Sequence, residues 1–249
     1  MSGDPDDLAQ LRLLQLADSG FPSGAYTLSH GLETLVADGT IAGDVELAAF
    51  VRVQLLSKFA RSDLIALLAA HGAGGGPASE EARPLDGEDP GWTGVDRLVA
   101  IDRRLTAAKL AADDRIGSAR VGRRLAAEVA RLAPDPALVA FLAAIADGRT
   151  SGNAAVAFGL AGRALGVDSH RTALAASSAM VIGLVAAAVR LGLIGHGAAQ
   201  RMVADAASDI SAAVELAGNG DWRELSPSAP QIEVALARHE TSLARQFAS

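Results

Sequence analysis

Apolar residues recur along the chain with the spacing of amphipathic helices. Between Asp44 and Phe59, the residues Leu47, Val51, Leu55 and Phe59 follow one another at intervals of four, which places them on one helical face. Asp44 is well placed to be the N-cap of this helix. Nowhere does the chain show the alternation of β-branched residues that marks a strand. The pattern predicts an all-α fold, a single-domain bundle of roughly ten helices that spans residues 1–249.

Helix start signals delimit two further helices. Asp135 and Pro136 suit the cap and the first position of one helix, and Asp168 is placed to cap the longest apolar helix, which extends to about Leu193. The apolar part of that helix, residues 173–189, is rich in alanine, with interspersed serine and glycine. It falls short of the roughly 20 strongly apolar residues that a bilayer requires. We therefore expect a buried core helix and no membrane partner.

Two stretches lack this regular pattern. Residues 72–94 are dense in glycine, proline and acidic residues, and such a composition predicts a mobile loop because it buries too little apolar surface to offset the entropy of ordering. The C-terminal tail, residues 226–249, places Ile232, Leu236, Leu243 and Phe247 on one helical face. An isolated helix of that length is marginal in water. We expect it to dock in a groove, supplied either by the body of the protein or by a partner.

Composition narrows the range of functions. Half of the 249 residues are hydrophobic, enough for a sizeable core. A formal net charge of −7 and a pI near 5.2 disfavour nucleic acid and anionic lipid as partners. The chain has no cysteine, which excludes disulfides and thiolate metal sites. The first ten residues, MSGDPDDLAQ, lack the order of a secretory signal, so we expect a cytoplasmic protein.

The sequence contains no recognisable catalytic motif. The only lysines, Lys58 and Lys109, do not follow a glycine as the P-loop requires. Ser23 and Ser151 lie outside the Gly-x-Ser-x-Gly pattern of α/β hydrolases. The arginines between residues 97 and 131 alternate with acidic residues, which indicates a solvated helix face rather than a nucleic-acid patch. We expect neither catalytic residues nor a cofactor, with a hydrolase of unrecognised site as a remote alternative.

Metal binding is an alternative that the histidines leave open. None of the five histidines forms an HExxH pair. His30 and Glu33, three residues apart, could offer two ligands from one helical face, but a closed metal site needs more. A dimer could supply a second pair. Otherwise His30 and Glu33 are polar surface or cap residues, and no metal site is expected in the single chain.

The stretch FPSGAYTLSHGLE, residues 21–33, resembles the N-terminal motif of the urease accessory protein UreF family. Further similarities follow in the order of the family and span nearly the whole chain. They comprise LLQLADS at 13–19, AAVAFGL at 154–160, AAVRL at 187–191, Gly195 with Gln200, SAP at 228–230, RHET at 238–241 and RQF at 245–247.

The resemblance implies an all-helical, non-enzymatic maturation factor for nickel urease. Such a protein forms a homodimer, binds the accessory protein UreD (also called UreH), and through that complex recruits the GTPase UreG to apo-urease for nickel insertion. The alternative is a nickel-binding metallochaperone that uses a dimer-shared site of His30 and Glu33.

Within that resemblance, the matched segments supply the candidate partner-interface residues. In the first motif, Pro22 stiffens the entry, Gly24 admits a close backbone, and Tyr26 offers a rigid anchor with a polar tip; a helix-packing turn is the fold-only alternative. Arg190 adjoins an apolar run and needs either an acceptor or access to water. The complete set is Pro22, Gly24, Tyr26, Ser29, His30, Glu33, Arg190, Gln200, Pro230, Arg238, His239, Glu240, Arg245 and Phe247.

Overall fold

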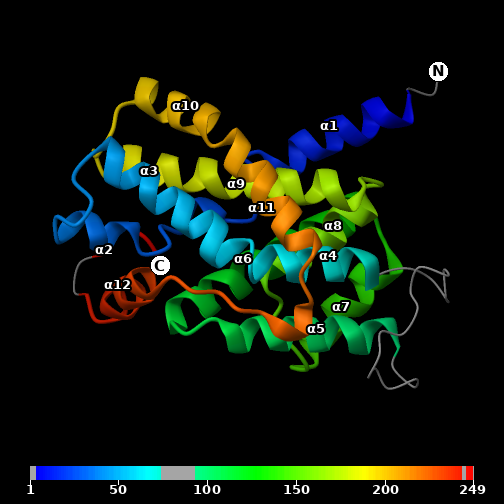
Figure 1. Ribbon diagram of the computed structural model, residues 1–249. Helices are drawn as coiled ribbons and strands as arrows, with labels where there is room; N and C mark the ends of the chain where they lie inside the picture. Colours follow the sequence, from blue (N-terminus) through cyan, green and yellow to red (C-terminus); the bar gives the residue numbers. More distant parts are fainter. Residues whose placement is uncertain (1–3, 74–92, 243–244, 249) are drawn as a thin grey trace.

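The computed structural model describes residues 4–73, 93–242 and 245–248. These residues form helices and connecting turns, with no β-strand among them, so the predicted all-α fold is confirmed (Figure 1). The helices are α1 (Pro5–Ala17), α2 (Leu32–Ala37), α3 (Asp44–Val53), α4 (Asp63–Ala73), α5 (Gly94–Ala108), α6 (Ala112–Leu132), α7 (Pro136–Ala146), α8 (Ala154–Ala164), α9 (Ser169–Arg190), α10 (His196–Asp205), α11 (Ala207–Gly218) and α12 (Pro230–Glu240).

Two of the three predicted N-cap residues, Asp135 and Asp168, are confirmed. Asp135 Oδ1 accepts two backbone N–H groups of the first turn of α7, at 2.9 and 3.1 Å, and Asp168 Oδ1 accepts one in α9 at 2.8 Å. The prediction for Asp44 was wrong by one residue, because Gly43 stands at the cap and Asp44 is the first helical residue. There its carboxylate still favours the positive end of the helix dipole.

The helix predicted between Asp44 and Phe59 is regular only in its first part. After α3 the chain widens into a π-helical segment, Gln54–Phe59, in which the Ala60 N–H donates to Leu55 O at 2.9 Å, five residues back. The extra residue rotates the helix face, and Lys58 becomes buried. Such π-bulges frequently occur at functional sites.

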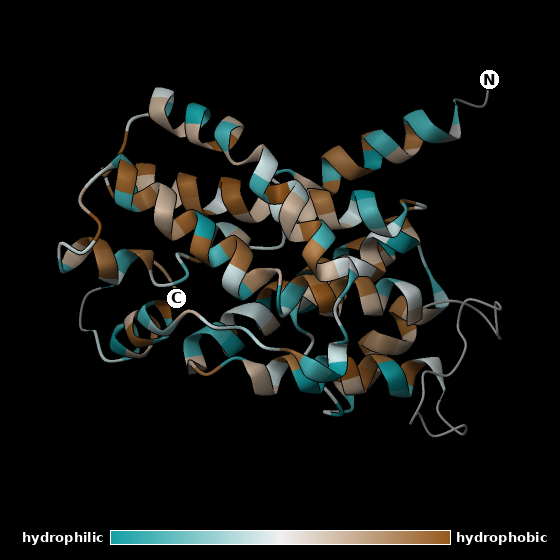
Figure 2. Ribbon diagram, viewed as in Figure 1, coloured by the Kyte–Doolittle hydropathy of each residue, from teal (hydrophilic) through white to brown (hydrophobic). Residues whose placement is uncertain are grey.

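Helix α9 lies at the centre of the body, where α1, α3, α4, α8, α10 and α11 pack against it (Figure 1). Its residues Val181, Leu184 and Val185 are almost completely buried, and Figure 2 shows how rich the helix is in hydrophobic positions. Among the helices that the structure describes, α9 alone is long and apolar enough to cross a membrane, and 56% of its most apolar window is buried inside the protein. The helix therefore serves as a core helix, as expected.

Two glycines allow helices to approach closely beneath α9. A Cβ on Gly159 of α8 would lie 2.3 Å from Leu67 O of α4, and a Cβ on Gly122 of α6 would lie 2.2 Å from Gly152 O. Both distances are far below van der Waals contact, so neither position accepts a side chain without backbone movement. These glycines set the spacing between α4, α6 and α8.

The body of the protein supplies the groove for the C-terminal tail. Helix α12 packs against α2 and α6, and its residues Ile232, Ala235 and Leu236 are buried. The tail is not one helix through Phe247, as its apolar stripe indicated, because α12 ends at Glu240. The stripe identified the buried residues but not the change of direction after α12.

Both ends of the range 72–94, which was predicted as a loop, belong to helices or their caps. Gly72 and Ala73 belong to α4, and Thr93 caps α5 through a capping box with Asp96. Reciprocal hydrogen bonds between Thr93 and Asp96 stabilise the helix start. Residues 74–92, the rest of that prediction, lie outside the described residues.

Candidate functional site

Residues 21–31 form an irregular turn between α1 and α2, and Leu32 and Glu33 open α2. Gly24 and Gly31 have φ angles of 78° and 87°, which glycine adopts at no steric cost. His30 lies between them at φ 53°, the one non-glycine residue with positive φ in the described part of the chain. A non-glycine residue in this region is uncommon. The turn thus holds His30 in a conformation that local preferences alone would not select.

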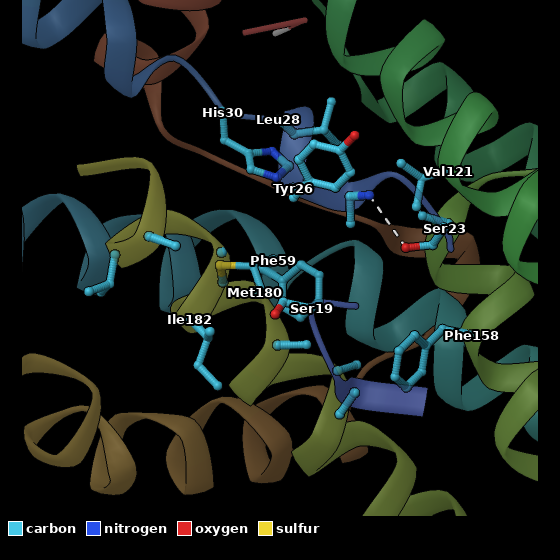
Figure 3. A pocket seen from close by; sticks show the side chains of 18 of the residues that line it. Ser19, Ser23, Tyr26, Leu28, His30, Phe59, Val121, Phe158, Met180 and Ile182 are labelled. Carbon is cyan, nitrogen blue, oxygen red and sulfur yellow. Dashed lines mark hydrogen bonds between the residues drawn. The ribbon is translucent and has the colours of Figure 1, made fainter. Parts of the chain in front are cut away.

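A cavity of about 660 Å³ lies between this turn and helices α9 and α10. Four of the predicted interface residues line it: Tyr26 and His30 from the turn, Arg190 from the end of α9, and Gln200 from α10. Figure 3 shows Tyr26 and His30 on the turn and Met180 on α9 around this space. The structure therefore brings together residues that are up to 174 positions apart in the sequence.

The rim of the cavity is apolar and open to solvent. Tyr26 is 60% exposed and Ile182 is 40% exposed. Along α9 the lining continues through the small residues Ala179, Gly183 and Ala186, which follow one another at three- or four-residue spacing on one helix face. We call this exposed strip, with Tyr26 and Ile182, the α9 groove.

The floor of the cavity is a buried cluster of charges. Lys58 Nζ lies 2.9 Å from Asp114 Oδ2 and 2.8 Å from Glu233 Oε1. Lys109 Nζ lies 2.9 Å from Asp63 Oδ1 and 3.7 Å from Asp114 Oδ1. Two ammonium groups thus face three carboxylates. Burying charges is costly unless they are paired in this way.

The pKa directions in the cluster agree with its geometry. Burial acts to lower the pKa of Lys109, but the neighbouring carboxylates of Asp114 and Asp63 outweigh burial and raise that pKa above 10.5. Burial acts to raise the pKa of Asp114, but Lys109 and Lys58 outweigh it and hold that pKa below 3.8. For His30, burial dominates and lowers the pKa below 6.5. Lys109 and Asp114 are therefore charged at neutral pH, whereas His30 is neutral.

The arrangement lacks the features of a preformed metal site. In the part of the chain that the structure describes, no group of three or more histidine, cysteine, aspartate or glutamate side chains could hold a metal ion. The floor carboxylates are engaged by lysines. His30 lines the cavity, whereas the Glu33 carboxylate is occupied by the C-terminal segment. The metal alternative consequently has no preformed site in the described protomer.

Glu33 anchors the end of the chain. Its Oε1 accepts the Gln246 N–H at 2.7 Å, and its Oε2 accepts the Phe247 N–H at 3.1 Å. The ring of His239, which is 1% exposed, lies with Nε2 3.1 Å from Glu33 Oε2 and Nδ1 3.1 Å from Asp113 Oδ2. We call residues 239–242 and 245–248, together with Glu33 and Asp113, the C-terminal clasp.

The clasp also completes the start of α6. The N-cap residue of that helix, Ala111, has no side chain that could cap it. Glu240 Oε1 instead accepts the Ala112 N–H at 2.6 Å, and an anion at this end of a helix is favourable. Arg245 donates to Asp113 Oδ2 at 3.1 Å and to the carbonyl oxygen of Glu240. Side chains from α2, α6 and α12 are thereby tied together.

The clasp reaches the cavity through Arg190. The Arg190 guanidinium lies 4.5 Å from the centre of the Phe247 ring, within the range of a cation–π contact. The next residue, Ala248, donates its N–H to Thr27 O at 2.8 Å, and Arg120 donates to the Thr27 hydroxyl at 2.8 Å. The opening turn, α9 and the chain end therefore form one connected surface.

The remaining predicted residues lie in different environments. Gly24 and Ser29 are buried within the turn. Pro22 and Pro230 are exposed, and Pro230 is the first residue of α12. Arg238 is exposed and forms an ion pair at 2.9 Å with the aspartate that follows α2. Contact of any of these side chains with a partner stays a prediction.

No motif or spacing in the sequence indicated the buried charged floor. Its members Lys58, Asp63, Lys109, Asp114 and Glu233 come from three separate stretches of the sequence, and only the tertiary structure joins them. The lysine content was the one sequence feature that pointed to this cluster. The chain has only two lysines, and both belong to the cluster.

Comparison with known proteins agrees with the motif resemblance. A family model described as UreF matches residues 41–207 of the chain. The chain belongs to the UreF family. Three relatives named urease accessory protein UreF match over nearly their whole length. The UreF of Arthrobacter sp. (strain FB24) is 30% identical over 96% of this chain and 97% of its own. The UreF of Corynebacterium glutamicum (strain R) is 30% identical over 97% of this chain and 98% of its own. The UreF of Trichodesmium erythraeum (strain IMS101) is 29% identical over 96% of this chain and 97% of its own.

Membership of the UreF family assigns the chain a role in urease maturation. The family model covers α3 to α10 and thus the charged floor residues Lys58, Asp63, Lys109 and Asp114. The opening turn and the clasp residues from 239 onward lie outside the residues that the model matches, and the three UreF relatives are similar over 96–97% of the chain.

Proposed function

We propose that this UreF family member is a non-enzymatic, cytoplasmic scaffold that acts as a homodimer in urease maturation. It binds the accessory protein UreD (UreH) and, in that complex, recruits the GTPase UreG to apo-urease for nickel insertion. The chain takes no part in the chemistry of nucleotide hydrolysis. It provides surfaces on which other proteins assemble.

The observation that carries this proposal is the α9 groove. It is the exposed apolar side of the cavity that Tyr26, Arg190 and Gln200 line, three residues that the family resemblance singles out. Exposed apolar surface rimmed by polar residues is typical of protein interaction sites. Small residues along α9 permit close approach of a second backbone, while Tyr26 and Arg190 are the residue types that dominate interface energetics.

The first experiment is co-expression of this chain with UreD and UreG, followed by purification through a tag on this chain. Light scattering of the eluted complex gives its mass and hence its composition. We expect an assembly that contains UreD and two copies of this chain. Elution of this chain without UreD, when UreD is folded, would contradict the scaffold function.

A matched pair of variants tests the groove. Ala186→Arg places a charged side chain in the α9 groove, whereas Ala48→Arg makes the same change at an exposed position of α3. We expect Ala186→Arg to lose a partner or the dimer and Ala48→Arg to retain the full assembly. Thermal unfolding of both variants verifies that each is folded. An intact assembly with a folded Ala186→Arg variant would exclude the groove as the partner surface.

A further inference from the structure

A second hollow, of about 670 Å³, lies where α5, α6 and the loop after α7 meet. Its lining includes four arginines: Arg103 from α5, Arg115 and Arg123 from α6, and Arg149 from the loop. The whole chain carries a net charge of −7, so the charge gathered at this hollow is opposite in sign to the net charge of the protein.

Backbone carbonyl groups hold these arginines in place. Arg103 donates from Nε to Arg149 O at 2.7 Å, and Arg123 donates from Nε to Ser151 O at 2.8 Å. Both side chains are exposed. Because each guanidinium is fixed through Nε, its two terminal Nη groups are left as donors for another molecule. Arg115 is held through Nη1 instead, which donates to Lys109 O at 2.8 Å and to Leu110 O at 2.6 Å.

A buried aspartate makes the loop a rigid support. Asp102 is fully buried, and its carboxylate accepts the Thr150 hydroxyl at 2.5 Å, the Gly152 N–H at 3.0 Å and the Asn153 N–H at 2.6 Å. Hydrogen bonds to a buried charge are stronger than those between neutral groups. The carbonyl groups that orient Arg103 and Arg123 belong to this tethered loop.

The positive charge of the hollow is only partly neutralised. Arg149 pairs with Asp96 at 2.6 Å, and the Lys109 ammonium pairs with Asp63 beneath the hollow. In residues 4–73, 93–242 and 245–248, no carboxylate pairs with Arg103, Arg115 or Arg123. Three oriented guanidinium groups therefore lack a counter-ion in the described structure.

We propose that this basic hollow binds an acidic peptide segment of a partner protein. The inference rests on the proposed scaffold function and gives the scaffold a second surface, separate from the α9 groove. Guanidinium groups match carboxylates in a planar, two-pronged geometry. The three unpaired groups come from two helices and need several carboxylates, which a peptide supplies along its length. Ala107 and Ile145 in the lining offer apolar contact for its other side chains.

A small phosphate compound fits this hollow less well. The hollow is open, so a small ion remains hydrated there and its attraction is screened by salt. Long nucleic acids meet the net negative charge of the remaining surface. An acidic peptide avoids both penalties because it covers only the hollow and contacts its apolar lining.

Calorimetric titration of the isolated chain with a hexaglutamate peptide tests the proposal, with pyrophosphate as the comparison ligand. Arg103→Gln/Arg123→Gln removes two charges from the hollow. Arg104→Gln/Arg124→Gln is the matched control, because each of its exposed arginines is the immediate neighbour in sequence and does not line the hollow. We expect the first pair to weaken peptide binding about tenfold or more and the control by about twofold or less.

A third variant gives an independent result without touching the arginines. Ala107→Glu introduces a negative charge at an exposed position that lines the hollow, and we expect it to weaken peptide binding at least tenfold, roughly the effect of losing a charged hydrogen bond. Circular dichroism verifies that all variants are folded. Three results would each overturn the proposal: no binding of the peptide, equal weakening by both arginine pairs, or tighter binding of pyrophosphate than of the peptide.

These titrations need neither UreD nor UreG. Peptide binding by an intact hollow, together with failure of the co-expressed assembly, would therefore reject the scaffold function and retain the acidic-segment site. Successful assembly without peptide binding would retain the scaffold function and reject the acidic-segment site.

Discussion

The guanidinium of Arg190, at the end of α9, lies 4.5 Å from the ring centre of Phe247, two residues before the last position of the chain. Phe247 is buried, whereas Arg190 is exposed and also lines the cavity beside the opening turn. This contact links the C-terminal clasp to the proposed partner surface. A substitution in the clasp is therefore expected to affect the partner surface, and a substitution in the partner surface is expected to affect the clasp.

A double-mutant cycle measures that contact. We expect Arg190→Met and Phe247→Leu to show a coupling of about 0.5–1 kcal/mol in the free energy of unfolding, because a cation–π pair at a partly exposed site contributes about this much. Urea unfolding of the wild type, the two single variants and the double variant gives the four free energies. Purely additive effects would mean that the contact contributes nothing.

Glu33→Gln is expected to loosen the clasp while leaving the core intact. The carboxylate accepts the N–H groups of Gln246 and Phe247, and a hydrogen bond to a charged group contributes about 1.5–3 kcal/mol. Hydrogen exchange at residues 245–248 should consequently become about tenfold faster or more. Glu46→Gln, an exposed change on α3, is the control and should leave these amides as they are. Unchanged protection in Glu33→Gln would show that Glu33 does not anchor the chain end.

Lys109→Met is expected to destabilise the protein by about 3–5 kcal/mol at pH 7, because it leaves the buried carboxylates of Asp63 and Asp114 without their shared ammonium. Arg61→Met removes an exposed cation near the π-helical segment, and such surface changes usually shift stability by less than about 0.5 kcal/mol. Urea unfolding provides both values. Equal effects of the two substitutions would show that the buried cluster has no special importance.

The same cluster sets the pH dependence of stability. The pKa of Asp114 is lower in the folded state than its ordinary 3.8, so its contribution is present above that value and is lost as pH falls below it. The pKa of Lys109 is higher in the folded state than its ordinary 10.5, so its contribution is present below 10.5 and is lost as pH rises further.

Unfolding free energies measured between acidic and alkaline pH test this assignment. The wild type should lose stability at both extremes. Lys109→Met should lose the alkaline dependence that Lys109 causes, and acidification should reduce its deficit relative to wild type because protonation neutralises the carboxylates that have lost the Lys109 ammonium. A deficit that is the same at every pH would contradict the assignment.

The candidate interface residues were chosen because they lie in contiguous motifs. The turn at residues 21–33 and the segments around Arg190 and His239 carry distinctive residue combinations, and the structure brings Tyr26, Arg190 and Gln200 to one cavity. The direction in which each side chain points could not be predicted. Ser29 and His239 are buried and contact the chain itself, since their environments depend on α12 and on other segments remote in sequence.

The charged floor and the basic hollow show the same limit. The arginines between residues 97 and 131 alternate with acidic residues along the chain, which indicated a mixed, solvated face. In the fold, Asp102 and Asp114 turn inward, whereas Arg103 and Arg123 are exposed at the hollow. The order of charged residues along the sequence does not show which of them are buried and which are exposed.

By itself, the sequence determined the helical class, most helix positions and the family, because helical periodicity, capping residues and contiguous motifs are local properties. Only the tertiary structure decided that α12 docks on the body, that α3 continues into a π-helical segment burying Lys58, and that two lysines neutralise carboxylates from distant segments. Those outcomes depend on which surfaces meet when the helices pack. Burial then assigns each charged group a partner from another part of the chain, because an unpaired charge in the interior is too costly to retain.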